Sequence, residues 1–417
     1  MRSLVIVILS LLVTIGGFMF RGINKPVEGK NPQSIADSNN VFAFSLYKRF
    51  ADSAGRNIVF SPLSISSALA LTYEGAKGET SNQICKAMHF TADKDAFKAN
   101  FRSLIEKIEK DTTDTNRAIQ FNMANSVWVA RGIKMLSSYT DLIKMYYDAK
   151  AANMKLSNPS AIESTRKEIN NWVGEKTHGK IDNMIGPGGL DASAKLVLIN
   201  AMYFDVRWAN TFPEVLTKKN IFYANGADSV NVDFMNGTYK LMYYQDSDME
   251  AVDLPYYMNK LSMIVFLPRK MDGVHNMEKM LDYNSYSSIT EKLIQERSMA
   301  KVVMSLPKFR ISESLSLADV LTKMGMPVAF TGMANFTRMT NEALHISIVD
   351  HKTYIDVSEK GTEAAAATKV QMRITSARPT PMKPIYFIAN HPFIFVIRDN
   401  VTGCILFMGK ISNPVKA

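Results

Sequence analysis

The stretch from residue 359 to residue 378, EKGTEAAAATKVQMRITSAR, constrains the fold of this chain more than any other part of its sequence. From Thr362 to Ile374, every second residue is small or apolar, and the residues between them include all of the charges. Such alternation is typical of a strand buried on one face. The alanine run favours a helix or loop instead, Gly361 is expected to give a flexible base, and three prolines at 379–384 forbid a regular strand beyond it. The segment therefore predicts either an edge strand or a stretch with two states, an exposed loop and a stable strand.

The composition is that of an ordinary globular protein, large enough to bury a substantial core. The 417 residues are 47% hydrophobic and 10% aromatic, which excludes disorder as the main state of the chain. Because only Cys85 and Cys404 are present, a disulfide scaffold and a zinc site built from clustered cysteines are excluded. Cys404 lies in an apolar run and is expected to be a buried free thiol. The net charge of +10 is scattered along the sequence, so nucleic-acid binding is not expected.

The common catalytic motifs are missing from the sequence. It has no GxSxG, HExxH, phosphate-binding glycine loop or GxGxxG. His89 follows Cys85 by one helical turn, but no further cysteine or histidine lies nearby to complete a zinc site. His351 is expected to be a structural histidine. We therefore expect no enzyme activity, no metal site and no cofactor.

The N-terminus has the features of an export signal. Arg2 precedes an uncharged run from residue 4 to residue 20, whose length falls between that of a secretory signal and that of a membrane span. We predict a signal peptide or an uncleaved signal anchor over residues 1–22, which makes the protein either secreted into the extracellular space or tethered to a membrane. Residues 23–38 are expected to be a polar tether, and residues 39–417 a single domain.

The spacing of the apolar residues and the positions of helix-capping and turn residues predict a mixed α+β fold. Helices are expected at 41–51, from Pro62 with Ser61 as its N-cap, and at 163–176. Strands are expected at 58–60, 196–204, 302–306, 393–397 and 405–408, with a hairpin formed by 251–254 and 261–267.

The sequence resembles the serpin family from about Val41 to Pro414. The resemblance rests on several separated motifs that follow one another in the order of the family. They are NIVFSPLSI at 57–65, NNW at 170–172, THGKI at 177–181, NAMYF at 200–204 followed by Trp208 and Phe212, LPKF at 306–309, DHK at 350–352, EKGTEAA at 359–365, HPFIF at 391–395 and LFMG at 406–409.

The resemblance implies a metastable serpin fold with three β-sheets, about nine helices and an exposed reactive-centre loop at about 359–383. It also implies inhibition of serine or cysteine proteases by suicide-substrate trapping. The protease cuts the loop and forms an acyl-enzyme, and the cut loop then inserts into the central β-sheet and deforms the captured enzyme. The expected partner is the target protease, held in a covalent complex, and the expected free state is a monomer.

The resemblance also implies roles for individual residues. The hinge of the loop is assigned to Glu359, Gly361, Thr362, Ala364, Ala365, Ala366 and Ala367. A polar cluster beneath the opening strands, the shutter, is assigned to Ser61, Ser64, Asn200 and His351. The breach, where insertion begins, is assigned to Trp208, and Lys308 is expected to pair with Glu359 at the base of the loop.

The reactive bond is predicted at Thr375–Ser376, from the spacing to Glu359 and from the end of the alternation at Ile374. Thr375 suits elastase-like or subtilisin-like enzymes. Arg373 and Arg378 are the competing positions, and either would suit a trypsin-like enzyme.

Two further interpretations concern the binding of polyanions and the functional class of the protein. Basic residues lie where some serpins bind heparin-like polyanions, but two glutamates interrupt them, so a solvated helix face and at most weak polyanion binding are expected. These basic residues are Lys94, Lys98, Arg102, Lys107 and Lys110. The alternative function is a non-inhibitory serpin that acts as a carrier, chaperone or storage protein. The small hinge residues favour inhibition.

Overall fold

A computed structural model of the chain describes residues 34–51, 55–112, 119–224, 228–362 and 383–415. They belong to one compact unit, Pro32–Ala417. The predicted signal segment at 1–22 lies outside the described residues. Within the described ranges, no helix is both long enough and apolar enough to cross a membrane.

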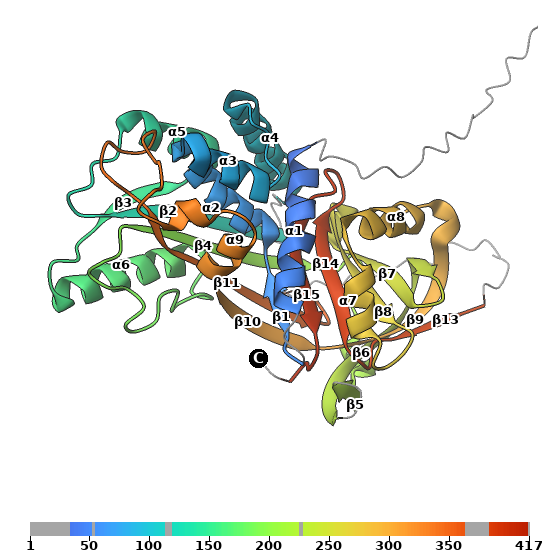
Figure 1. Cartoon of the computed structure of the whole chain (residues 1–417). Coiled ribbons are helices and arrows are strands. Elements are labelled where there is room, and N and C mark those ends of the chain that lie inside the picture. Colours follow the sequence, from blue (N-terminus) through green and yellow to red (C-terminus); the bar gives the residue numbers. More distant parts are fainter. Residues whose placement is uncertain (1–33, 52–54, 113–118, 225–227, 363–382, 416–417) are drawn as a thin grey trace, which may run out of the picture. The chain divides into compact units, whose positions relative to one another are not determined.

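Nine α-helices and four short 3-10 turns are found among the described residues (Figure 1). The helices are α1 (Ile35–Ala51), α2 (Pro62–Gly75), α3 (Gly78–Ala87), α4 (Lys94–Thr112), α5 (Ser137–Tyr147), α6 (Pro159–Lys176), α7 (Val274–Met280), α8 (Tyr283–Leu293) and α9 (Ala318–Lys323). The 3-10 turns are η1 (Glu214–Leu216), η2 (Tyr257–Asn259), η3 (Glu296–Ser298) and η4 (Pro327–Phe330).

The described strands form two hydrogen-bonded sheets. The strands are β1 (Ile58–Phe60), β2 (Ile119–Ala130), β3 (Lys150–Met154), β4 (Leu196–Arg207), β5 (Lys218–Ala224), β6 (Asp228–Gln245), β7 (Met249–Pro255), β8 (Leu261–Pro268), β9 (Met299–Pro307), β10 (Phe309–Ser316), β11 (Ile346–Ser358), β12 (Gly361–Thr362), β13 (Ile385–Ile388), β14 (Phe393–Asp399) and β15 (Ile405–Ile411).

The six-stranded sheet has the order β10-β11-β12-β4-β2-β3. Strands β11 and β4 pair directly and in parallel over the stretch from Ile346 to Thr353 of β11. Beyond Thr353, towards their C-terminal ends, the two strands no longer pair with each other, and β12 lies between them, antiparallel to both. The two-residue strand β12 therefore lies where β11 and β4 cease to pair with each other, at the C-terminal ends of both strands.

The nine-stranded sheet is held together by the long strand β6. This strand pairs first with β5, then with β9 and finally with β7. The resemblance implies three separate sheets. In the described residues two of them form the single nine-stranded sheet, because β6 pairs with strands of both.

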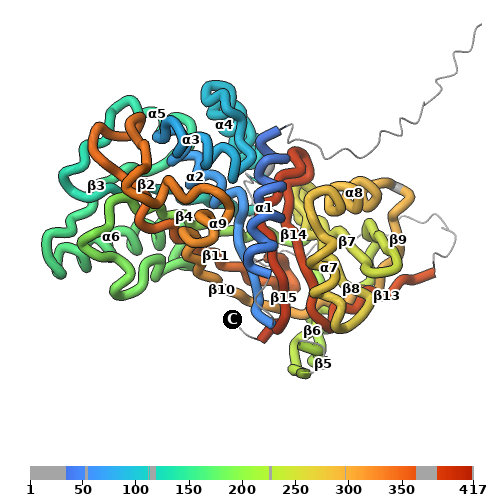
Figure 2. Tube along the Cα trace, viewed as in Figure 1, coloured from blue at the N-terminus to red at the C-terminus, as the bar shows by residue number. Residues whose placement is uncertain are grey.

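Helix α2 occupies the space between the two sheets, with β15 on one side and β2 and β4 on the other. All fourteen of its residues are buried, as expected for a helix composed mostly of small and apolar residues. Its start agrees with the prediction, because the Ser61 side chain accepts a hydrogen bond from the Ser64 amide and Pro62 takes the first helical position. Figure 2 shows α1 running beside β15 at the same centre.

Helix α6 covers the other face of the six-stranded sheet. Residues of α6, β2 and β4, with the segment at 181–194, form a second hydrophobic cluster around Trp128 and Ile169. A strand entering between β11 and β4 would have the main core on one face and the side of this second cluster on the other.

The helices and strands predicted outside the segment from 359 to 383 are all present, with boundaries that differ by up to six residues. The predicted tether at 23–38 is wrong at its C-terminal end, because α1 begins at Ile35 and Ser38 is buried. The helical pattern of those residues is masked in the sequence by their polarity. Asn39 and Asn40 are nevertheless buried, because their amides donate to the carbonyls of Ile405 and Gly403.

The close packing of β15 predicts a large effect of one methyl group. A Cβ on Gly409 would lie 2.5 Å from the Ile58 carbonyl oxygen and 2.6 Å from the Phe395 ring. We expect Gly409→Ala to lower the stability by about 1–3 kcal/mol, as overpacking does elsewhere. Gly186→Ala is the matched control, since no atom lies within 4 Å of its Cβ position. Urea midpoints measure both, and equal midpoints for the two variants would contradict the packing described.

Candidate functional site

At the C-terminal end of β4, the region that the resemblance assigns to the breach, aromatic rings stack beside β12. Trp208 is only 3% exposed, and its ring stacks on Tyr256 at 4.4 Å between centroids. The Trp208 indole donates to the Ser358 carbonyl at 2.9 Å, and its amide donates to the Lys360 carbonyl at 3.0 Å. The Tyr256 hydroxyl is hydrogen-bonded to the Thr362 hydroxyl at 2.6 Å. Trp208 therefore holds the chain on both sides of Glu359.

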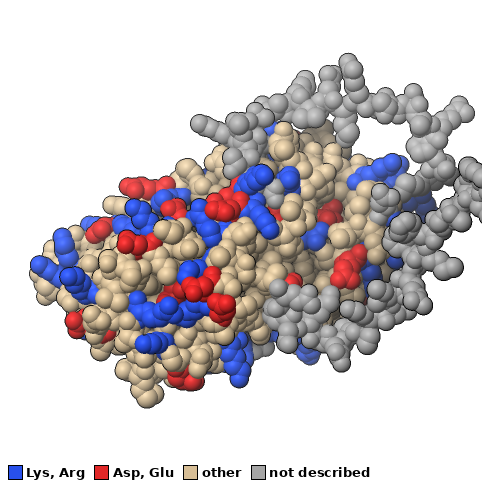
Figure 3. All heavy atoms as spheres, turned by 90° about the horizontal axis from the view of Figure 1, so that it is seen from above, with Lys and Arg blue, Asp and Glu red and all other residues tan. Residues whose placement is uncertain are grey.

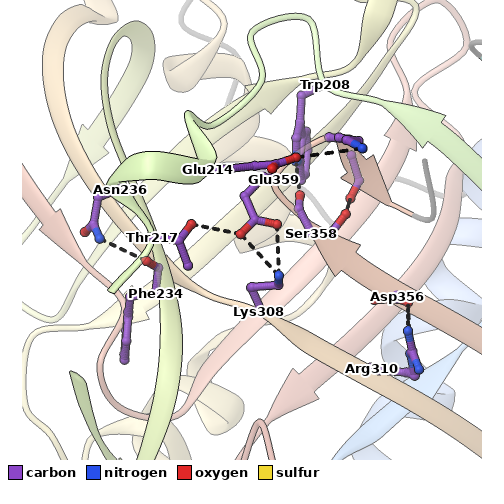
Figure 4. Close-up of polar contacts among 12 residues, drawn as sticks. Trp208, Glu214, Thr217, Phe234, Asn236, Lys308, Arg310, Asp356, Ser358 and Glu359 are labelled. Atoms are coloured by element: carbon purple, nitrogen blue, oxygen red, sulfur yellow. Dashed lines mark hydrogen bonds and ion pairs between the residues drawn. The ribbon is translucent and has the colours of Figure 1, made fainter. Parts of the chain in front are cut away.

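Glu359 fixes the turn between β11 and β12 through both of its carboxylate oxygens. Lys308 approaches these oxygens at 3.0 and 3.1 Å, and the Thr217 hydroxyl donates to one of them at 2.8 Å (Figure 4). Burial alone would raise the pKa of Glu359, but a hydrogen bond from its own backbone amide, together with those from Lys308 and Thr217, outweighs burial and holds the pKa below its usual value. The expected pair of Glu359 and Lys308 is present.

Gly361 lies between two strands and is not the flexible base expected from the sequence. Its backbone pairs with Ser358 on one side and Arg207 on the other. A Cβ at this position would lie 2.2 Å from the Val206 carbonyl oxygen. The glycine is therefore required by close approach of backbone rather than by mobility.

The exposed loop expected at 359–383 is too long at its N-terminal end. Glu359 and Thr362 are buried, at 7% and 0% exposure, because β11 and β4 cease to pair with each other above Thr353 and offer their edges to β12. The remaining hinge and reactive-bond residues lie outside the described residues. These are Ala364, Ala365, Ala366, Ala367, Arg373, Thr375, Ser376 and Arg378.

The four residues assigned to the shutter lie in one buried hydrogen-bonded cluster between α2 and the six-stranded sheet. Asn200 is its centre. The Asn200 side-chain oxygen accepts from the Ser64 hydroxyl at 2.7 Å, and its amide donates to the Ser64 carbonyl and to Asn125, both at 2.6 Å. The Ser61 hydroxyl donates to the sulfur of Met202. The cluster joins β4, β2 and the start of α2.

His351 links β11 to this cluster as a neutral imidazole. The Ser61 amide donates to Nε2 at 3.0 Å, so Nε2 has no proton, and Nδ1 donates to the Asn200 oxygen at 2.7 Å. Burial lowers the pKa of His351 to about 3. A proton on Nε2 would face the Ser61 amide and break this contact between β11 and α2.

The basic stripe on α4 does not form a free patch. Lys94 turns inward and donates to the carbonyl oxygens of Tyr73 and Ala76, and burial lowers its pKa to about 8. Lys98 pairs with Asp95, and Arg102 with Glu106. Figure 3, which looks down on the side that α4 occupies in Figure 1, shows basic and acidic side chains interspersed. The solvated helix face is therefore the better description of α4.

Sequence reasoning missed several residues that complete the site. Tyr256 was assigned to the turn of the predicted hairpin, yet it is fully buried between Trp208 and Thr362. Thr217 and Asn125 were not singled out because each is a single polar residue in an unremarkable stretch. Only the requirement that buried Glu359 and Asn200 have partners would have led to them.

The neutral His351 predicts a specific loss of stability in acid. Its pKa is about 3 in the folded protein and near 6.5 when unfolded, so the unfolded state takes up the proton first. This stability is present above pH 6.5 and is lost as the pH falls, by roughly 2 kcal/mol between pH 6.5 and 4.5. His351→Gln should be less stable than the parent at pH 7.5, and the difference should shrink towards pH 4.5. Urea midpoints across this range test it, and a difference independent of pH would contradict it.

Comparison with known proteins agrees with this geometry. The family model described as "Serpin (serine protease inhibitor)" matches residues 37–414. An uncharacterised serpin-like protein of the archaeon Methanosarcina mazei is 34% identical over 383 residues, which are 91% of this chain and 87% of that protein. Serpin B6 of Macaca fascicularis is 35% identical over 385 residues, 91% of this chain and 99% of that protein.

Solved structures give the same result. Serpin48, described as a highly specific serpin of the insect Tenebrio molitor, superimposes with a TM-score of 0.78 at 29% identity, covering 91% of this chain and 98% of that one. Human thyroxine-binding globulin in complex with thyroxine gives a TM-score of 0.82 at 26% identity, covering 92% and 100%. The protein described above belongs to the serpin family.

Proposed function

We propose that this protein inhibits serine or cysteine proteases by trapping them on its own cleaved reactive loop. One observation supports this most directly. Gly361 and Thr362, the first residues of the small-residue segment, already form a strand between β11 and β4. The residues that follow them in the sequence have the alternation expected of a longer strand in the same place.

The register of the sheet supports insertion without any sliding of strands. Thr362 lies between Val357 and Val206, and lower down His351 pairs with Asn200 and Asp350 with Ile199. The offset between β11 and β4 is the same at both levels. If β11 and β4 moved apart sideways, the two residues of each facing pair would therefore be in position to pair with the same residue of a strand inserted between them.

The face on which Thr362 lies supports the inward parity. Its side chain is buried beside Val206 and Val357, which belong to the main core. With that parity, the alanines at 364 and 366 would face the core, where a bulky or charged side chain would slow insertion. The chain from Thr362 to Thr375 would form a strand of roughly 45 Å, long enough to carry a captured enzyme along the sheet.

A gel of the full chain mixed with elastase, subtilisin and trypsin tests the proposed function. We expect an SDS-resistant complex with at least one of them. The reactive bond stays a prediction at Thr375–Ser376, so the small C-terminal fragment released from the denatured complex should begin at Ser376 in its mass spectrum. A fragment beginning at Ile374 or Pro379 would assign the bond to Arg373 or Arg378 instead. Cleavage without a complex across a broad panel of serine and cysteine proteases would contradict trapping.

Thr362→Arg should convert the inhibitor into a substrate. Because Thr362 already lies in the sheet, arginine there should displace β12 before the cut. Insertion must then bury an unpaired charge beside Val206, at a cost of several kcal/mol, roughly 2–7 on the scale of buried polar groups, and the delay lets the acyl-enzyme hydrolyse. The stoichiometry of inhibition, measured by titration against active protease, should rise severalfold or more. Thr322→Arg, on the exposed side of α9, is the matched control and should trap as the parent does. Undiminished trapping by Thr362→Arg would show that the inward parity is wrong.

Asp350 lies where a carboxylate would gain an oppositely charged partner only after the reactive loop has inserted. It is half-buried on β11, and in the described part of the chain no salt bridge involves it. Burial raises its pKa to about 6, against a hydrogen bond with Ser316. Continuing the observed register from Thr362 places Lys369 directly opposite Asp350 in the inserted strand. Cross-strand pairs of opposite charge stabilise a sheet by about 0.2–1 kcal/mol.

A double-mutant cycle on the cleaved protein tests this pairing. Asp350→Asn and Lys369→Gln should each lower the thermal midpoint of the cleaved form, and the pair should cost less than the sum, with a coupling of roughly 0.5–1 kcal/mol. The same cycle on the uncleaved protein is the control and should show no coupling. Additive effects in the cleaved form would exclude the proposed register.

A second candidate function, carriage of a small molecule, has one observation in its favour. A cavity of about 340 Å³ is lined by Asp253 and Arg398, both buried, and by the apolar side chains of Ile294 and Met299. One Asp253 carboxylate oxygen has no hydrogen-bond partner among the described residues. Thyroxine-binding globulin, a structural relative, was solved with thyroxine. The gel separates the two functions, because a carrier need not form the complex.

We propose a location outside the cytoplasm on the grounds given by residues 1–22. The support is the basic start and the uncharged run of the sequence.

A further inference from the structure

A surface cavity of about 670 Å³ lies away from the breach and the shutter. It is enclosed by the C-terminal half of α1, the C-terminal end of α3 and the end of α9. The side chains that matter here are Lys48 and Arg49 from α1, Lys86 from α3, and His89 just beyond α3.

The walls of this cavity are basic. Four of the eight lining residues are Lys, Arg or His, and none is Asp or Glu. Lys48, Arg49 and Lys86 are exposed, so their ammonium and guanidinium groups are free to move over the cavity. No ion pair is formed by these three within the part of the chain that the structure describes. Lys48 acts at longer range on Asp282, where it joins the Ser285 hydrogen bonds in lowering a pKa that burial tends to raise.

Helix ends account for part of this charge. Lys48 and Arg49 lie in the last turn of α1, and Lys86 in the last turn of α3, where cations stabilise the helix dipole. Each helix end supplies only about half an elementary charge. The cavity therefore retains an excess of positive charge.

Stabilisation of the helix dipole does not explain why a histidine is present at position 89. It follows the C-cap of α3 with a φ of 54°, a left-handed conformation in which glycine is favoured. A side chain there costs about 1 kcal/mol, yet an imidazole is present and lines the cavity. Burial lowers the pKa of His89, so near pH 7 the ring is a neutral hydrogen-bond donor beside three cations.

We propose that this basic cavity binds a ligand with closely spaced phosphate or sulfate groups. Lys48, Arg49 and Lys86 would supply charge-assisted hydrogen bonds to its anionic oxygens, and His89 a neutral one. The volume admits a ligand with several such groups rather than a single ion. The site differs from the basic stripe of α4, where Lys94 is turned inward and two other cations are paired with carboxylates. The proposal is independent of whether the protein traps proteases.

Isothermal titration calorimetry of the full chain tests this site with two probes, inositol hexakisphosphate and a heparin-derived octasaccharide. We expect at least one to bind at 50 mM NaCl, more weakly at 200 mM. Lys48→Gln with Lys86→Gln should weaken binding about tenfold or more, and reduce the dependence of log Kd on log salt by roughly two. The control is Lys107→Gln with Lys110→Gln on α4, which makes the same change of net charge and should alter Kd less than about twofold.

His89→Gly separates loss of binding from loss of folding. Glycine relieves the left-handed backbone, so the thermal midpoint should rise or stay level while affinity for the probe falls severalfold. Binding of the phosphate probe alone or of the sulfated probe alone identifies the ligand source. Failure of both probes to bind, an equal loss in the α4 control, or unchanged affinity in His89→Gly would each overturn the proposal.

Discussion

The fold depends on a line of separation within the six-stranded sheet, between β11 and β4. Along its lower part these strands are hydrogen-bonded to each other, and at its upper end they are hydrogen-bonded to Gly361 and Thr362 instead. Every ladder bond between β11 and β4 occupies backbone groups that a longer inserted strand would use in a more favourable antiparallel pair. Under the proposed function, the uncleaved protein therefore has one strand fewer in this sheet than the inserted form.

Two clusters of side chains control that line. At the C-terminal ends of both strands, Trp208, Tyr256 and the Glu359–Lys308 pair hold Gly361 and Thr362 in place. Further down, His351 on β11 and Asn200 on β4 are joined to each other and to the start of α2. Buried polar groups of this kind are costly to leave unpaired, so these hydrogen bonds oppose separation of β11 and β4. In the proposed inserted form, Thr368 would occupy that level between Asn200 and His351.

The sequence predicted the elements well but not how the site is assembled. The strand at Ile58–Phe60 and the cap at Ser61 follow from local signals, namely a short apolar run and a Ser-Pro helix start. The depth of insertion of β12 was not predictable, because Gly361 has one meaning in a flexible loop and another when a carbonyl lies 2.2 Å from its missing Cβ. Lys94 was misjudged for a similar reason, since a helical stripe does not reveal which lysine turns inward to cap a neighbouring helix. Pairing across distant parts of the chain decides such residues.

If the proposed insertion occurs, the sheet gains stability when the chain beyond Thr362 is free to enter it. The direct measurement is the thermal midpoint of the full chain before and after a single cut in the segment from residue 373 to residue 378, with both fragments still associated. Insertion adds a complete set of ladder hydrogen bonds and buries one face of the new strand. We expect a clearly higher midpoint after cleavage, by tens of degrees if several kcal/mol are gained, and this result would support insertion. Equal midpoints before and after the cut would contradict it.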